Sequence, residues 1–166
     1  VMIFSDNVPL EQEVKLKKLG REKGLLVMGP DCGTAIINQA PLGFANRMRA
    51  GKIGIVGASG TGIQEICASI DRQGGGITQA FGTGGRDLSP DVGAIMTRFC
   101  LQTLYDDPNT KVIVLTSKLP HPKVERALMD MVRQSPKPVV VRFIGRKRRY
   151  FRKSLYVTAT LEEAGR

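Results

Sequence analysis

The residues from Lys52 to Glu65, KIGIVGASGTGIQE, constrain the fold more than any other stretch of this chain. The apolar run Ile53–Val56 predicts a buried strand, and the isoleucines after the turn recur at helical spacing. Between strand and helix lie three glycines and two hydroxyl residues: Gly57, Ser59, Gly60, Thr61 and Gly62. A strand, a glycine-rich turn and a helix together aim backbone N–H groups at an anion. We therefore expect these five residues to bind a phosphate, a carboxylate or an acyl phosphate.

Known glycine-rich motifs do not account for this turn. A Walker loop needs Lys and then Ser or Thr after its last glycine, but Ile63 and Gln64 follow Gly62. The dinucleotide spacing G-x-G-x-x-G is not met, and Thr61 stands where the nucleophile elbow G-x-S-x-G needs its last glycine. The alternative is a tight strand-to-helix turn that binds nothing.

Strands and helices alternate from Lys52 onward, which predicts an α/β fold with a doubly wound parallel sheet. The expected strands are Ile53–Val56, Ile77–Phe81, Val112–Thr116, Val139–Ile144 and Leu155–Thr158, and the expected helices are Ile63–Arg72, Pro90–Leu104 and Lys123–Arg133. Ligands of such sheets lie beyond the carboxyl ends of the strands, so the loops that follow the strands are the candidate site.

The first part of the chain has a different pattern. It predicts a helix over Pro9–Lys23, a strand over Leu25–Met28 and a connector over Asn38–Gly51. The chain begins on Val1 and enters an apolar run at once, so we expect it to be a segment of a longer protein.

Composition excludes several classes of protein. The chain has 166 residues, 42% of them hydrophobic and 24% charged, as is ordinary for a globular domain. No apolar run approaches the roughly 20 residues that span a bilayer, so we expect no membrane partner. The three cysteines are scattered, which argues against a disulfide framework and favours a reducing, cytoplasmic setting. No cluster of ligands surrounds any cysteine, so no metal site is expected.

The net charge of +10 is local. Seven basic residues and no acidic ones lie between Arg142 and Lys153, and without them the chain carries 18 basic and 15 acidic residues. Tyr150 and Phe151 are interleaved with these cations, as in proteins that bind single-stranded nucleic acid. No nucleic-acid-binding motif accompanies them, so we do not expect nucleic acid as a partner. A solvated loop, an anion contact and a partner contact remain open.

The loop after the strand Ile77–Phe81 offers further candidates. Gly84 and Gly85 are expected to bind the anion together with the first turn, and Arg86 could clamp a carboxylate or phosphate through its planar fork. Asp87 is a possible site residue. The alternative is that Arg86 and Asp87 pair with each other. In either case, Ser89 is expected to cap the next helix, with Pro90 at its first position.

Other loops carry single candidates. Lys118 follows a strand as Arg86 does, and we expect these two cations to be the catalytic residues. His121 is the only histidine, and no neighbouring pattern makes it part of a triad or a metal site. Cys32, beside Asp31, is either a reactive thiol, an anion-loop residue or an inert buried side chain.

Three motifs in order give the chain a family resemblance: GPDCGT at Gly29, IGIVGASGTGIQE at Ile53 and GTGGRDLS at Gly82. Together they resemble the FdrA family, an acyl-CoA-synthetase-like branch of the succinyl-CoA synthetase α-subunit superfamily. The resemblance implies the tail of a Rossmann-like CoA-binding domain with its connector over residues 1–45. It implies a flavodoxin-like ligase domain, truncated at its C-terminus, over residues 46–166.

The resemblance also implies a chemistry. The superfamily passes an acyl phosphate between CoA and a phosphohistidine, but the matching loop here is GRKRRYFRKS and contains no histidine. FdrA-like proteins share that loss and are linked to an oxamate carbamoyltransferase of purine-nitrogen (allantoin) breakdown. We therefore expect no tightly bound cofactor, with carbamoyl phosphate, phosphate or CoA as substrates and other protein subunits as partners. Two alternatives are an acyl-CoA ligase subunit that works with a partner chain and a non-catalytic remnant.

Overall fold

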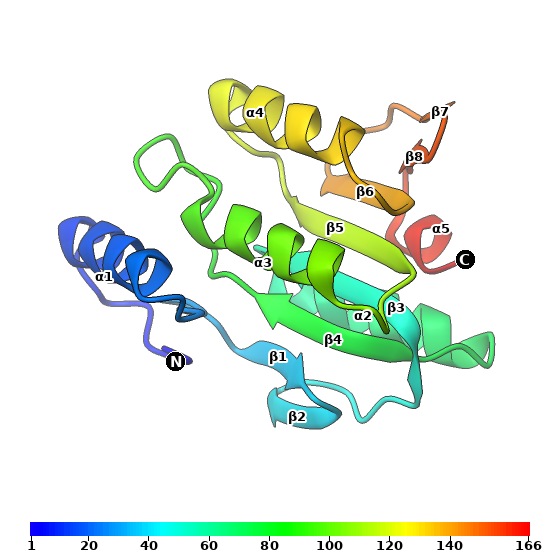
Figure 1. Cartoon of the computed structure of the whole chain (residues 1–166), viewed down its shortest axis with the longest axis horizontal. Helices are drawn as coiled ribbons and strands as arrows, with labels where there is room; N and C mark the ends of the chain where they lie inside the picture. Colours follow the sequence, from blue (N-terminus) through cyan, green and yellow to red (C-terminus); the bar gives the residue numbers. More distant parts are fainter.

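Five parallel strands form the centre of the structure, a computed structural model that describes residues 1–166 (Figure 1). In their order across the sheet they are β4 (Ile77–Gly82), β3 (Ala50–Gly57), β5 (Val112–Lys118), β6 (Val139–Ile144) and β8 (Leu155–Val157). Numbered along the chain, these five have the order 2-1-3-4-5, which is the flavodoxin-like order. The expected α/β fold with a doubly wound parallel sheet is confirmed.

Three further strands extend the sheet at its edges, and the sequence analysis missed them. β1 (Thr34–Ile37) and β2 (Ala40–Gly43) form a hairpin that joins β4 in antiparallel orientation, and β7 (Tyr150–Arg152) pairs antiparallel with β8. Asn38 and Gln39 make the two-residue hairpin turn at φ values of 48° and 70°. Two residues at positive φ suit a hairpin, but without a glycine the sequence gives little warning of one.

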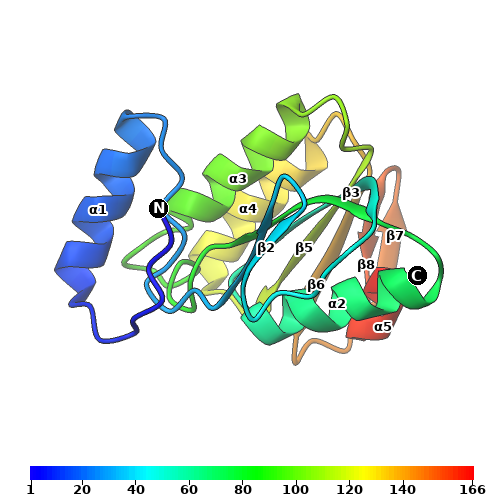
Figure 2. The ribbon, with the colours of Figure 1, turned by 90° about the horizontal axis from the view of Figure 1, so that it is seen from below.

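Helices cover both faces of the sheet (Figure 2). Helices α3 (Ile95–Asp106) and α4 (Pro122–Arg133) lie on one face, and α2 (Gly60–Arg72) and the short α5 (Leu161–Gly165) lie on the other. Each face has its own hydrophobic core, and alternate residues of β5 divide between them: Ile113 and Leu115 belong to one core and Val114 to the other. Helix α1 (Leu10–Glu22) lies at one end of the molecule and contacts α3. None of the helices combines the length and the apolar character needed to cross a membrane.

Some predicted elements differ from those observed. Leu25–Met28 forms no strand, because only Met28 bridges to Met2 near the start of the chain. Helix α2 begins at Gly60, three residues earlier than its apolar pattern. Helix α3 begins at Ile95, not at Pro90. Ser89 does accept a hydrogen bond from the amide of Val92 (3.3 Å), but this bond closes a turn that precedes the helix.

Candidate anion-binding site

Three loops meet at the carboxyl edge of the sheet: the loop before β1, the turn after β3 and the loop after β4. The thiol of Cys32 lies 3.3 Å from the carbonyl oxygen of Gly82. A Cβ added to Gly82 would lie 2.3 Å from the carbonyl oxygen of Thr34, and one added to Gly84 would lie 2.2 Å from that of Pro30. The three motifs that resemble the FdrA family are therefore neighbours in space.

The turn after β3 ends in a capped helix. Ser59 Oγ accepts a hydrogen bond from the amide of Gly62 (3.2 Å), and the amide of Ile63 donates to the carbonyl oxygen of Ser59 (3.0 Å). The amides of Gly60 and Thr61 have no acceptor inside the helix, because the first N–H groups of any helix lack one. Thr61 is exposed and Gly60 partly so. Two amides at the positive end of the helix are thus left to meet an anion.

Thr116 lies directly behind these amides. It pairs with Gly57 across β3 and β5, the point where the strand order reverses and where doubly wound sheets bind ligands. Its side chain is completely buried, and its Oγ1 has no hydrogen-bond partner. A Cβ added to Gly62 would lie 3.2 Å from this oxygen, so Thr116 Oγ1 lies at the first turn of α2. Lys118 is exposed and, two residues further along β5, projects from the same face.

The loop after β4 is held by a buried ion network. Lys17 Nζ of α1 lies 2.8 Å from Glu13 Oε1 and 2.8 Å from Asp87 Oδ1, and it donates to the carbonyl oxygen of Thr83 (2.9 Å). All three charged side chains are completely buried. Asp87 Oδ2 accepts hydrogen bonds from the amide (2.8 Å) and hydroxyl (2.6 Å) of Thr97. Asp87 therefore holds the start of α3, the role expected of Ser89.

Arg86 does not pair with Asp87, so that alternative is wrong. Its Nε lies 2.9 Å from Glu13 Oε2, and its Nη2 donates to the carbonyl oxygen of Val8 (2.6 Å). The guanidinium is thus held by α1 and the segment before it. These contacts do not favour the ligand clamp that the sequence analysis expected of Arg86.

The remaining candidates in these loops have structural contacts. Cys32 is 2% exposed, and burial raises the pKa of its thiol, which opposes the reactive-thiol hypothesis. Gly84 adopts φ +90° and packs against the backbone of Pro30, so the fold requires a residue without a side chain at this position. Asp31 and Gly85 are exposed and adjacent, since a Cβ on Gly85 would lie 2.5 Å from Asp31 Oδ2.

The sequence suggests only that Arg142 is one of the basic residues of a loop. In the structure it lies within β6 and is 7% exposed. Its Nη1 donates to the carbonyl oxygens of Arg146 (2.7 Å) and Thr158 (3.2 Å). Its Nε is buried without a partner, and burial lowers the pKa of the guanidinium. Arg142 pairs with Thr116 across β5 and β6, so the two residues that carry these unpartnered atoms are neighbours in the sheet.

Comparison with known proteins identifies the family of the chain. A family model described as "CoA binding domain" matches residues 48–145, from just before β3 to the end of β6. The chain belongs to the CoA-binding domain family. The curated proteins to which it is similar include α-subunits of succinate–CoA ligases.

Three relatives show the range of similarity to the chain. It is 56% identical over 146 residues to YahF of Escherichia coli K12, described as uncharacterized, and this match covers 88% of the chain and 28% of YahF. It is 27% identical to succinate–CoA ligase subunit alpha 1 of Archaeoglobus fulgidus, covering 88% of the chain and 50% of that subunit. It is 26% identical to the sulfoacetate–CoA ligase subunit SauD of Bilophila wadsworthia, covering 87% and 50%. The chain thus spans half or less of these relatives.

Solved structures share the fold of this family member. ATP citrate lyase of Methanosaeta concilii, in complex with (3S)-citryl-CoA, matches with a TM-score of 0.72 and 22% identity over 87% of this chain and 25% of that one. The dinucleotide-forming acetyl-coenzyme A synthetase 1 of Candidatus Korarchaeum cryptofilum matches with a TM-score of 0.64 and 19% identity, covering 87% and 32%.

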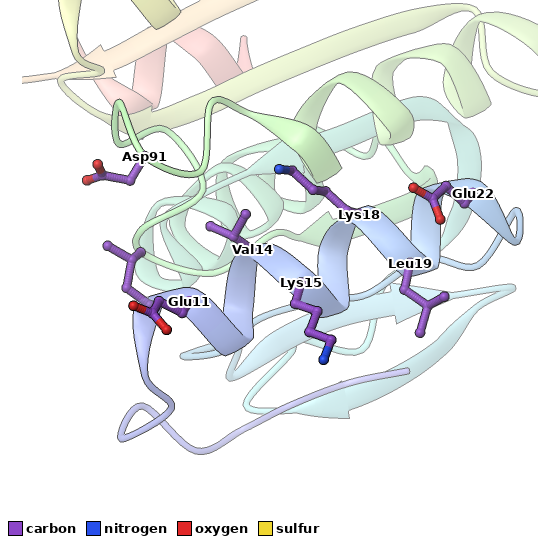
Figure 3. A pocket seen from close by; sticks show the side chains of 8 residues that line it. Glu11, Val14, Lys15, Lys18, Leu19, Glu22 and Asp91 are labelled. Atoms are coloured by element: carbon purple, nitrogen blue, oxygen red, sulfur yellow. The ribbon is translucent and has the colours of Figure 1, made fainter.

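Two surface hollows of the chain lie outside the candidate anion-binding site. One, of about 660 Å³, runs along α1 and reaches Asp91 (Figure 3). It is lined by Leu10, Glu11, Val14, Lys15, Lys18, Leu19, Glu22 and Asp91. Three of these side chains are carboxylates and two are ammonium groups, so the hollow presents no single charge to a ligand.

The other hollow, of about 750 Å³, lies between α4 and the β7–β8 hairpin. It is lined by five cationic residues, by no acidic residue and by the rings of Tyr150 and Phe151. The cations are Arg133, Lys137, Arg148, Arg152 and Lys153. Two other arginines of the basic segment are paired, Arg146 with Glu125 and Arg149 with Glu163.

His121 is exposed at the start of α4, where its Nδ1 accepts a hydrogen bond from the amide of Lys123 (3.4 Å). The structure contains no group of three or more His, Cys, Asp or Glu side chains that could hold a metal ion.

Proposed function

We propose that the chain binds the phosphoryl group of an acyl phosphate at the N-terminus of α2, as part of an FdrA-type oxamate carbamoyltransferase. The observation that carries this proposal is the pair of first-turn amides, Gly60 and Thr61, beside the unpartnered hydroxyl of Thr116. Two backbone amides and one side-chain hydroxyl are then available at the first turn of α2. The helix dipole adds a favourable potential for a dianion at the same point.

The reaction would convert oxalurate and phosphate into oxamate and carbamoyl phosphate. A phosphate oxygen forms a bond to the carbamoyl carbon, the bond from that carbon to the oxamate nitrogen breaks, and this nitrogen takes up a proton. Negative charge develops on the carbamoyl oxygen after the new bond forms and before the old bond breaks. Preorganised N–H donors and a cation stabilise such charge. We assign the cation to Lys118, because it lies on the same face of β5 as Thr116 and forms no ion pair, whereas Arg86 is bound to Glu13.

Phosphorolysis of oxalurate by the purified protein with its co-purifying subunits tests this function. Replacing Ser59 by Asp keeps a helix cap but places a carboxylate where the phosphoryl group is expected, so the rate should fall by about 100-fold or more. Ser59→Asn keeps the cap without the charge and is the matched control. Equal rates for the two variants would remove this turn from the mechanism.

A second candidate function is that of an acyl-CoA ligase subunit working with a partner chain. The names of the ligase relatives and the basic hollow between α4 and β7–β8 favour it. CoA carries a diphosphate and a 3′-phosphate. Arg148, Arg152 and Lys153, which form no ion pair, and two aromatic rings suit phosphate groups and an adenine ring, whereas Arg133 is paired with Asp130. Binding of CoA that is several-fold tighter than that of dephospho-CoA, and is lost in Arg148→Gln with Arg152→Gln, would favour this function. Lack of binding to either CoA or phosphate would leave the non-catalytic remnant.

A further inference from the structure

Arg142 is a buried cation that lacks an anionic partner. It is 7% exposed, and it takes part in none of the ion pairs within 4.0 Å. Its nearest acidic influence is Glu163, which is itself paired with Arg149. A buried charge without a counter-charge is costly, and proteins normally supply a partner or a ligand for it.

One edge of the guanidinium is used and the other is free. Nη1 is bound by the carbonyl oxygens of Arg146 and Thr158. Nε has no partner, and Nη2 donates to no group of the chain. The Nε–Nη2 edge presents two parallel N–H groups, the geometry that binds both oxygens of a carboxylate.

Arg142 belongs to a row of residues that leads to the α2 turn. Gly57, Thr116 and Arg142 are paired in register across β3, β5 and β6. Val114 and Val140 precede Thr116 and Arg142 by two residues and pack in the core under α2, so Thr116 and Arg142 project toward that same face. Two strand spacings, about 10 Å, separate the first and last members of the row.

We propose that Arg142 binds the carboxylate of a substrate whose other end is held at the N-terminus of α2. The substrate class is therefore a small carboxylic acid that also carries the acyl group to be phosphorylated. This inference rests on the proposed function and deepens it, because it assigns the acid end of the substrate to a named residue. Thr116, between the two ends, can donate its hydroxyl to either.

Nuclear magnetic resonance of the ¹⁵N-labelled chain tests the inference without a mutation. The buried Nε–H of Arg142 exchanges slowly and gives its own signal. Oxamate should shift this signal in a saturable way, and inorganic phosphate should shift the amides of Gly60 and Thr61. Sodium chloride at equal ionic strength should shift neither.

The outcomes separate the inference from the function on which it rests. If phosphate moves the two amides but oxamate leaves the Arg142 signal unchanged, the inference is wrong, a bound water satisfies Nε, and the function stands. If oxamate moves the Arg142 signal and phosphate leaves the amides unchanged, the carboxylate site stands and the proposed phosphate site fails. If neither moves, both fail.

A pair of variants adds a quantitative readout. Arg142→Gln should weaken oxamate binding by about tenfold or more, the worth of a charge-assisted hydrogen bond, and leave phosphate affinity within about twofold. Arg126→Gln, which removes an exposed arginine of α4, changes the net charge equally and should leave both affinities unchanged. Equal effects of the two variants would overturn the inference.

Discussion

Lys17 Nζ and Asp87 Oδ1 lie 2.8 Å apart in a completely buried ion pair, although the two residues are 70 positions apart in the chain. Because Glu13 Oε1 lies at the same distance from Lys17, one cation is shared by two carboxylates. Lys17 also donates a hydrogen bond to the carbonyl oxygen of Thr83, in the loop after β4. The position of that loop at the sheet edge therefore depends on a residue of α1.

Replacing Lys17 by Met should cost about 3–5 kcal/mol of unfolding free energy, because it leaves Asp87 buried without a counter-charge and leaves Glu13 with Arg86 alone. Urea denaturation measures this loss. Lys15→Met, on the exposed side of the same helix, is the control and should change stability by less than about 0.5 kcal/mol. Similar losses of unfolding free energy in the two variants would show that the buried ion network does not stabilise the protein.

Ser59→Ala should lower stability by about 1 kcal/mol, because the amide of Gly62 loses its acceptor. Ser59→Asp should retain that stability without phosphate. In phosphate at about a hundred times its Kd, the native protein should gain about 2.7 kcal/mol, but Ser59→Asp should gain nothing. Thermal unfolding with and without phosphate measures both effects. A phosphate response in Ser59→Asp equal to that of the native protein would argue against the site.

Two glycines, Gly82 at the end of β4 and Gly85 in the loop after it, should respond differently to replacement by alanine. In Gly82→Ala the new Cβ would lie 2.3 Å from the backbone oxygen of Thr34, so β1 must move away from β4 and stability should fall by about 2 kcal/mol or more. In Gly85→Ala the conflicting atom is the end of the exposed Asp31 side chain, which can rotate away. That variant should lose less than about 1 kcal/mol in urea denaturation. The reverse order would contradict the described packing of the three loops.

Stability should fall in alkaline solution partly because of Cys67. Burial raises the pKa of its thiol from 9.0 to about 12. Between these values the unfolded chain loses the thiol proton while the native protein keeps it, so the native state binds more protons. The unfolding free energy should therefore decrease as pH rises above 9, by about 1.4 kcal/mol per pH unit for this thiol.

Cys67→Ala should show a shallower decrease between pH 9 and 10.5 than the native protein, whatever its stability at neutral pH. Denaturation at a series of pH values gives the two slopes. Parallel curves would mean that the thiol titrates equally in both states.

The sequence predicts the central sheet well, because β3, β4 and β5 are apolar runs that are each followed by a helix of clear period. It predicts the α2 turn for the same reason, since Ser59 and its glycines combine cap and turn residues. The pattern also predicts helix α1, but not the side that this helix buries. Its buried side is Glu13, Lys17 and Gly20, whereas Leu16 and Leu19 are exposed. Apolar periodicity cannot reveal which side of a helix packs through ion pairs.

The same limitation explains Arg86 and Arg142. Sequence places both after or within strands near the edge of the sheet, but cannot tell which of them meets a carboxylate of its own chain. Glu13 is 73 residues before Arg86, and no local signal connects them. Arg142 was hidden among the cations that follow it, because burial distinguishes it from them and charge does not.

A crystal structure of the chain grown with inorganic phosphate would show whether the N-terminus of α2 binds an anion. We expect a tetrahedral anion within hydrogen-bond distance of the amides of Gly60 and Thr61 and of the Thr116 hydroxyl. Crystals that diffract well and hold saturating phosphate, yet show those amides bonded only to water or to the protein's own oxygens, would contradict it.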